Sequence, residues 1–133
     1  MTTDSVADLL IRLKNASMVD KDFIELPHAK ALEALAKMLE KAGYLSGVKT
    51  FKVAGKGYKR LHLDLARDED GVLKIEQVIR YSKPGLRVYA NNSELSRYGR
   101  GLGKVFVSTS QGVLMLDDAR KRKLGGEVLC RVY

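Results

Sequence analysis

The sequence has few of the residues that cross-link chains or hold metals: one cysteine and two histidines among 133 residues. Cys130 has no partner for an intramolecular disulfide, and its place in an alternating apolar stretch indicates a buried strand residue rather than a catalytic thiol. His28 and His62 stand alone, without Cys or carboxylate residues at metal-ligand spacing. We expect both histidines to be structural, and we expect no metal and no cofactor.

Long hydrophobic runs are also missing. No apolar stretch approaches the roughly 18 to 20 residues that a membrane helix needs, and residues 1–11 lack the basic start and apolar stretch of a signal peptide. We therefore expect a soluble, intracellular protein without membrane association. A composition of 45% hydrophobic and 30% charged residues is enough for a core, and 133 residues fit one compact domain or two small subdomains.

The excess of positive charge lies in the C-terminal half of the chain. The net charge is +8, yet residues 1–79 hold 13 Lys and Arg against 12 Asp and Glu, whereas residues 80–133 hold 11 against 4. A localised basic field attracts polyanions and releases their counterions on contact, which favours a nucleic acid or an anionic membrane as partner. A merely solubilising surface fits the same charge.

The first half of the chain has the pattern of two helices and three strands. Apolar spacing predicts a helix starting at Ser5 and another between Pro27 and Gly43, because proline suits a first turn and glycine ends a helix. Alternating or apolar stretches predict strands at 23–26, 48–53 and 61–65. The last two strands are expected to form a hairpin.

The most polar break, residues 67–71, is the expected boundary between subdomains 1–70 and 71–133. Beyond it, apolar stretches predict strands at 72–75, 78–81, 86–89, 105–107, 113–116 and 127–133, with a helical turn at 91–97 and a helix at 117–123. Pro84 and Gly85 predict a type II turn.

A catalytic set is hard to assemble from this sequence. The glycines at 99, 101 and 103 suggest a phosphate loop, but the spacing of the dinucleotide fingerprint and the Lys-Ser or Lys-Thr pair of a P-loop are absent. Ser108, Thr109 and Ser110 lie outside any G-x-S-x-G pattern, and neither histidine is assignable as their base. We expect no enzyme and no small-molecule substrate.

The polar segment from Ser108 to Gly112 is better interpreted as a recognition surface. Small hydroxyl side chains approach closely and both donate and accept hydrogen bonds, and Gly112 allows unusual backbone geometry. An ordinary polar hairpin turn explains the same residues equally well. Tyr89 follows Lys83 and Arg87, which pairs a stacking ring with cations, although a core tyrosine is the competing interpretation.

Four ordered blocks of the sequence resemble one family, the bacterial-type eighth protein of the small ribosomal subunit. The most specific block is GKVFVSTSQGVLMLDDARK, from Gly103 to Lys121, followed by GGEVLC at 125–130. Similar too are DSVADLLIRLKNA at 4–16 and SKPGLRVY at 82–89. The resemblance runs from end to end of the chain.

The resemblance implies an α+β fold, with an N-terminal α/β subdomain packed against a mainly β C-terminal subdomain. It also implies a structural constituent of the small ribosomal subunit that binds the central domain of 16S ribosomal RNA early in assembly. Its expected partners are this RNA, neighbouring small-subunit proteins and, in some bacteria, its own operon mRNA, whose translation it represses. The expected location is the cytoplasmic ribosome, with an organellar ribosome left open.

The resemblance assigns the main RNA contacts to one segment: Ser108, Thr109, Ser110, Gln111 and Gly112. It adds Tyr89 and the basic hairpin around Lys56, and the residue pattern adds Lys83 and Arg87. A second rank of expected RNA contacts comprises Arg12, Lys14, Asn15, Lys59, Asn92, Arg100 and Arg120.

Two positions depart from the family pattern. Ser5 replaces a usual proline, which should barely alter function. Gln111 replaces a frequent basic residue, which should reduce nonspecific affinity. Two other classes of function stay open on the residues alone: an RNA-processing enzyme, and a protein-interaction module whose basic face docks on acidic partners.

Overall fold

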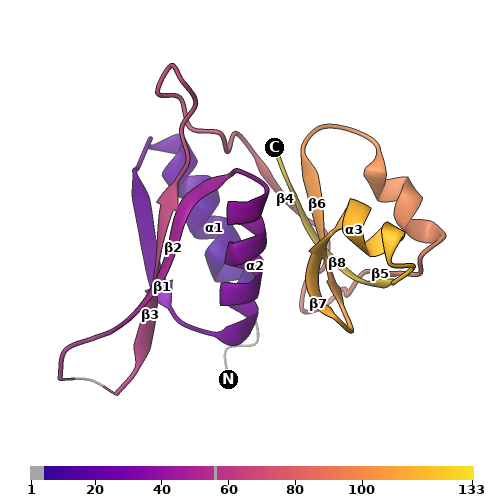
Figure 1. Cartoon of the computed structure of the whole chain (residues 1–133), viewed down its shortest axis with the longest axis horizontal. Coiled ribbons are helices and arrows are strands. Elements are labelled where there is room, and N and C mark those ends of the chain that lie inside the picture. The colour runs from indigo at the N-terminus through magenta and orange to yellow at the C-terminus, as the bar shows by residue number, and fades with distance from the viewer. Residues whose placement is uncertain (1–4, 56) are drawn as a thin grey trace. The chain divides into compact units, whose positions relative to one another are not determined.

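The structure is a computed structural model that describes residues 5–55 and 57–133 (Figure 1). It divides into two compact units, Ser5–Glu76 and Gln77–Tyr133, which we name the N-terminal and C-terminal units. Helices and antiparallel sheets occur in both, which confirms the α+β class. Residues 71–76 belong to the N-terminal unit, and Leu73 in this segment pairs with Arg67 as an isolated bridge.

The N-terminal unit is a three-stranded sheet with two helices against it (Figure 1). Its elements are α1 (Ser5–Met18), β1 (Phe23–Pro27), α2 (Lys30–Lys41), β2 (Leu45–Lys52) and β3 (Lys59–Leu65). The strand order is β1-β3-β2, with antiparallel pairing throughout. The expected β2–β3 hairpin is therefore confirmed, and β1 joins the other edge of β3.

Strict alternation along β3 separates the core from the open face of this sheet. Leu61, Leu63 and Leu65 are buried, whereas His62 and Asp64 between them are partly exposed. Each helix presents a stripe of small and leucine side chains to the core, and these are Leu9, Leu10, Leu13 and Ala16 from α1 and Leu32, Leu35, Ala36 and Leu39 from α2. Burial of this apolar surface is the main source of stability for the unit.

His62 bridges two carboxylates on the open face of the sheet. Its Nδ1 lies 2.8 Å from Glu25 Oε2 and its Nε2 lies 3.0 Å from Asp64 Oδ1. Phe23 stacks on the imidazole ring with 4.8 Å between ring centroids. Both ring nitrogens can donate only when the imidazole is protonated. The hydrogen bond to Glu25 therefore raises the pKa of His62, and the hydrogen bond to Asp64 raises it further by a smaller amount.

Stability should therefore depend on pH through His62. The folded protein holds the proton more tightly than the unfolded chain, whose histidine pKa is near 6.5, so the stabilisation is complete below that pH. It is lost as the pH rises through the raised folded-state pKa. His62→Gln should lower Tm by about 3 °C near pH 5.5 and by much less near pH 8.5, followed by circular dichroism. An equal loss at both pH values would contradict this.

The C-terminal unit is a five-stranded sheet with short helices. Its elements are β4 (Val78–Arg80), β5 (Tyr89–Ala90), the 3-10 helix η1 (Glu94–Gly99), β6 (Lys104–Thr109), β7 (Gly112–Met115), α3 (Leu116–Lys121) and β8 (Gly126–Val132). The order is β4-β8-β6-β7, and β5 pairs with the start of β8. In the described part of the chain, no helix is long and apolar enough to span a membrane.

One core of this unit lies between η1, α3 and one face of the sheet. Its fully buried members include Leu95 of η1, Ala119 of α3, and Val107 and Val128 from adjacent strands. Cys130 is buried in β8, as predicted, and this burial raises the pKa of its thiol to about 12. A thiol that stays protonated is a poor nucleophile.

Three local predictions for residues 72–89 are wrong. The expected strand 72–75 contributes only the bridge between Leu73 and Arg67, and strand 86–89 contributes only its last residue, Tyr89, to β5. The turn at Pro84 and Gly85 runs from Lys83 to Leu86, and Gly85 does not take the positive φ that a type II turn requires. For residues 86–89 the deciding contact is the pairing of Tyr89 and Ala90 with distant β8, which local propensity does not contain.

Candidate nucleic-acid interface

The predicted recognition segment is the tip of the β6–β7 hairpin. Only Ser110 and Gln111 form the turn, because Ser108, Thr109 and Gly112 belong to the paired strands. Gly112 has a φ of 103°, a conformation in which glycine is favoured, where the chain re-enters the sheet. The segment is thus a tight turn rather than a five-residue loop.

The Thr109 side chain stabilises this turn by hydrogen bonds to its backbone. Its hydroxyl donates to the Gly112 carbonyl at 2.8 Å and accepts the Gln111 N–H at 3.1 Å. The hydroxyls of Ser108 and Ser110 have no hydrogen-bond partner among the described residues, and Ser110 is exposed. Two of the three hydroxyls are therefore available to a ligand, and the third is structural.

The strand register places a carboxylate between Ser108 and Tyr89. Glu127 of β8 pairs with Ser108 of β6 on one side and with Tyr89 of β5 on the other. Directly paired residues point to the same face of a sheet, and here that is the face opposite to the buried Val107 and Val128. We call Tyr89, Glu127 and Ser108 the polar row.

Two donors hold Glu127 in place within the polar row. Its Oε2 accepts hydrogen bonds from the buried Ser82 hydroxyl and from Arg87 Nη1, the latter at 3.2 Å. The same Ser82 hydroxyl accepts the Val88 N–H at 3.3 Å. The network fixes the irregular segment 82–88 against β8 and so fixes the position of Tyr89.

Tyr89 is a surface residue and not a core tyrosine, because the residue is 68% exposed. Its exposed ring is suited to stacking on a base. Lys83 is also exposed but lies in the preceding turn, where its backbone pairs with Leu86. The structure therefore brings Tyr89 and Arg87 to the polar row and leaves Lys83 outside it.

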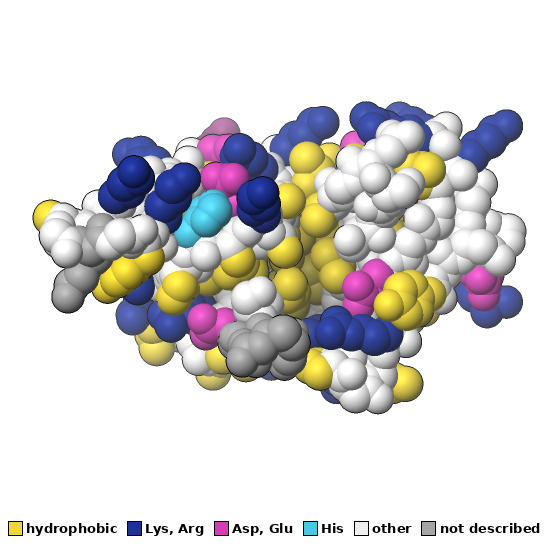
Figure 2. Space-filling model, turned by 90° about the horizontal axis from the view of Figure 1, so that it is seen from below, with side chains coloured by type: hydrophobic (Ala, Val, Ile, Leu, Met, Phe, Trp, Pro, Cys, Tyr) yellow, Lys and Arg dark blue, Asp and Glu magenta, His cyan; other side chains and the backbone are white. Residues whose placement is uncertain are grey.

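A basic side chain at the end of α3 contacts the hairpin turn. Arg122 Nη1 donates to Gln111 Oε1 at 3.1 Å, so the turn carries a cation although residue 111 itself is neutral. Figure 2 shows further Lys and Arg side chains over the drawn face of the C-terminal unit. Arg122 thus supplies at the turn the charge that Gln111 lacks.

Asn92 and Arg120 line one shallow hollow of the C-terminal unit. Its other lining residues are Ser93, Ser96, Asp117 and Lys121. Among the described residues, nothing hydrogen-bonds to the buried Oδ1 atom of Asn92. Asn92 and Arg120, both expected as second-rank RNA contacts, therefore lie together. The structure records no contact between them and the polar row.

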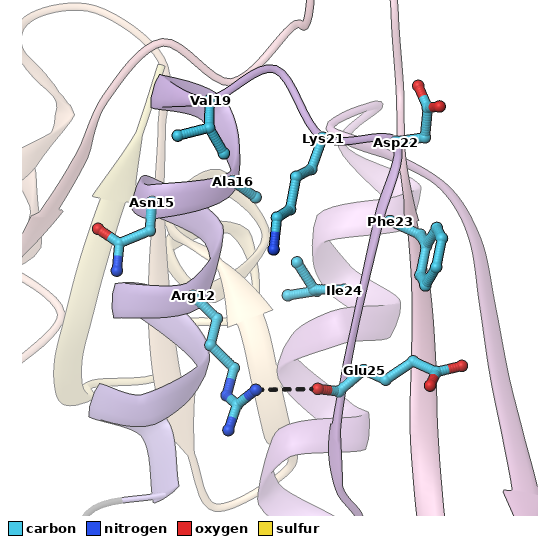
Figure 3. Close-up of a pocket in the computed structure, with 9 residues that line it drawn as sticks. All are labelled: Arg12, Asn15, Ala16, Val19, Lys21, Asp22, Phe23, Ile24 and Glu25. Atoms are coloured by element: carbon cyan, nitrogen blue, oxygen red, sulfur yellow. Dashed lines mark hydrogen bonds between the residues drawn. The ribbon is translucent and has the colours of Figure 1, made fainter.

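The second-rank residues Arg12 and Asn15 line a groove between α1 and β1 in the N-terminal unit (Figure 3). Arg12 is already engaged: it donates to Asp8 Oδ1 and to the Glu25 carbonyl, both at 3.1 Å. Lys21, which the sequence interpretation did not single out, points into the same groove. Lys14 and Lys59 are exposed elsewhere on this unit, and Lys56 lies outside the described residues.

Two functional candidates in the C-terminal unit were missed from the sequence, Glu127 and Arg122. One signal for Glu127 was available: it is the only acidic residue between Ala119 and Tyr133, in an otherwise basic stretch. Arg122 had no such signal, because it is one of four consecutive basic residues. Its role depends on where the end of α3 meets the hairpin.

The described residues assemble no catalytic centre. No group of three or more His, Cys, Asp or Glu side chains in residues 5–55 and 57–133 is placed to hold a metal. Within the C-terminal unit, which contains neither histidine, Ser108 pairs with Glu127 and Gln111 contacts Arg122. The C-terminal unit instead carries a polar row, a hydroxyl-bearing turn and neighbouring cations, which are features of a binding surface.

Comparison with known proteins names the family. Residues 4–133 match the family described as Ribosomal protein S8. The chain is 40% identical to the small ribosomal subunit protein uS8 of Helicobacter acinonychis and 41% identical to that of Helicobacter pylori, strain Shi470, with both chains covered completely. The uS8 protein of Nautilia profundicola is 40% identical over the same full length. The chain belongs to the ribosomal protein S8 family, which confirms the resemblance and the expectation of a non-catalytic protein.

Proposed function

We propose that this chain is a structural component of the small ribosomal subunit that binds the central domain of 16S ribosomal RNA through its C-terminal unit. The observation that carries the proposal is the polar row: Ser108, Glu127 and Tyr89 share one face of the sheet, beside a turn with two available hydroxyls. Hydroxyls, a carboxylate and a ring can contact base edges, 2'-hydroxyls and a base face, respectively.

Recognition by shape suits this surface better than attraction alone. Ser108 and Ser110 are small, so an irregular RNA helix can approach the backbone of the turn closely. Glu127 repels phosphates, and its fixed carboxylate therefore favours a site where bases or 2'-hydroxyls, and not the phosphate chain, face β8. Arg87 beside this row and Arg122 beside the hairpin turn are the cations proposed to contact phosphates.

Charge supplies the remaining attraction. The C-terminal unit carries the excess of cations, and the contribution of each phosphate contact falls as salt rises. In the proposed division of labour, Arg87, Arg100, Arg120 and Lys83 provide salt-dependent affinity, and the hydroxyl turn provides selectivity. The groove with Arg12 and Asn15 is a second, weaker contact on the N-terminal unit.

Binding of folded RNA by one small protein also fits two finer roles. An early role in assembly requires binding to RNA without other ribosomal proteins, and both units have their own cores to support this. Repression of its own operon requires an mRNA segment that copies the shape of the ribosomal site. Neighbouring small-subunit proteins are further proposed partners.

The test is a comparison of two RNAs with the purified chain. A transcript of the 16S central domain should bind at least 100-fold more tightly than a length-matched transcript of shuffled sequence, measured by filter binding at 0.15 M salt. Crosslinks from a photoreactive group at Gln111 should map to one irregular helix of that domain. Equal affinity for both RNAs would overturn the proposed selectivity.

Nuclease treatment separates this proposal from a protein-docking function. Copurification of neighbouring ribosomal proteins should be lost when RNA is digested. Retention of acidic partners after digestion would instead favour the protein-interaction module.

A further inference from the structure

A buried arginine lies beneath the glycine loop, which we define as residues 99–103. Arg131 of β8 is only 8% exposed, yet no described carboxylate forms an ion pair with it. Its Nε donates to the Tyr81 hydroxyl at 3.0 Å, and its two terminal nitrogens donate to backbone carbonyls of residues 98, 100 and 102. A buried charge is costly unless it is compensated, and here carbonyl dipoles compensate it.

The direction of these carbonyls fixes the direction of the amides that follow them. The Arg100 and Leu102 carbonyls accept from Arg131 at 2.7 and 2.6 Å, and no peptide bond in the described chain is cis. In a trans peptide the C=O and the next N–H point in opposite directions. The N–H groups of Gly101 and Gly103 therefore point away from the guanidinium.

These two amides are backbone donors on the exposed side of the loop. Neither N–H has a hydrogen-bond partner among the described residues, and both glycines are exposed. They have positive φ values of 104° and 77°, a backbone conformation that residues with side chains rarely adopt. Backbone amides that point outward from a loop are donors that suit an anion.

The surrounding charges favour the same ligand. Arg100 is exposed within the loop. Arg120 is close to the start of the loop, because its Nη1 lies 3.9 Å from the point where a Cβ atom on Gly99 would be. Asp117 is the one acidic residue that shares a small hollow with Gly103 and Arg131. The inward carbonyls leave the positive ends of their dipoles on the outer surface, where they add to the charge of Arg100.

We propose that the outer face of the glycine loop binds a phosphate group of the RNA backbone, held by the N–H groups of Gly101 and Gly103 and by the Arg100 side chain. Arg131 is the positioning residue, because it turns both amides outward. That the phosphate comes from RNA rests on the proposed function. That these donors bind a phosphate group does not.

The first experiment uses inorganic phosphate and the full 15N-labelled chain. Phosphate is titrated at constant ionic strength against chloride, and saturable shifts of the Gly101 and Gly103 amides are expected in the NMR spectrum. Arg100→Gln should weaken this binding about fivefold, and Asp117→Asn should strengthen it about twofold. Arg97→Gln, with the same loss of charge at an exposed position two residues before the loop, should leave it unchanged.

Arg131→Lys tests the positioning role. Lysine keeps the charge but cannot reach three carbonyls with a planar fork, so phosphate binding should fall and trypsin should cleave after Arg100 faster, with the overall Tm checked in parallel. If Arg131→Lys unfolds the chain, Arg100→Gln and Asp117→Asn still decide the question. Absence of saturable shifts in the unsubstituted chain would overturn the site.

The second experiment identifies the source of the phosphate. Cognate RNA should shift the same two amides, and Arg100→Gln should weaken its binding about threefold at 0.15 M salt. If RNA binds and leaves both amides unshifted, the proposed ligand is wrong. If phosphate binds as expected but no RNA does, the proposed function fails while the site stands.

Discussion

Ser110→Phe should weaken binding of the cognate RNA about 100-fold, a loss of about 2.7 kcal/mol. Ser110 is an exposed residue of a two-residue turn, and its hydroxyl has no partner among the described residues. A phenyl ring there would keep an RNA helix away from Ser108 and the polar row. Binding to shuffled RNA should change less than threefold, because it depends on charge and not on close approach.

Two further variants control this experiment. Ser46→Phe places the same bulk on an exposed residue of β2 and should leave both affinities unchanged. Ser110→Ala removes only the hydroxyl and should cost cognate binding about 1 kcal/mol. Equal losses of cognate and shuffled RNA in Ser110→Phe would contradict a selective role for the turn.

Neutralising four cations together should flatten the salt dependence of RNA binding. With Lys83, Arg87, Arg100 and Arg120 changed to Gln, the slope of log K against log salt should fall by about 3, because each lost phosphate contact removes about 0.7 to 0.9. Affinity should be measured for cognate RNA between about 0.05 and 0.3 M KCl, the range in which counterion release dominates.

The matched control carries the same change of net charge on the N-terminal unit. Its four substitutions to Gln are at exposed lysines: Lys37, Lys41, Lys49 and Lys74. The slope of this control should stay within about 1 of the unsubstituted value. A slope that changes equally in both variants would show that net charge, and not the placement of these cations, sets the affinity.

The elements with strong local patterns were predictable. The pattern of apolar residues predicts which face is buried, both in the alternation along residues 61–65 and in the helical spacing after Ser5 and Pro27. The structure has a strand and two helices at these places. The hairpin around Ser110 was also expected, because a polar segment separates two apolar ones. Strand 86–89 failed because Tyr89 and Ala90 pair with β8 while the preceding residues are held by Ser82 and Glu127.

The candidate site was only half visible in the sequence. Ser108 and Tyr89 were candidates from their types and neighbours, but Glu127, which lies between them, is 19 residues from Ser108 along the chain. Arg131 was one more basic residue in an apolar strand. Its contact with carbonyls of residues 98–102 depends on β6 and β8 being paired.

By itself the sequence determined the α+β class, the basic C-terminal half, the hydroxyl-bearing turn and the family, because periodicity, charge and motif are all local or additive properties. Only the tertiary structure decided which side chains act together. Antiparallel pairing of β5, β8 and β6 put Tyr89, Glu127 and Ser108 in one row, and the burial of Arg131 turned the amides of the glycine loop outward. Both depend on contacts between residues far apart in the chain, whose register no local pattern specifies.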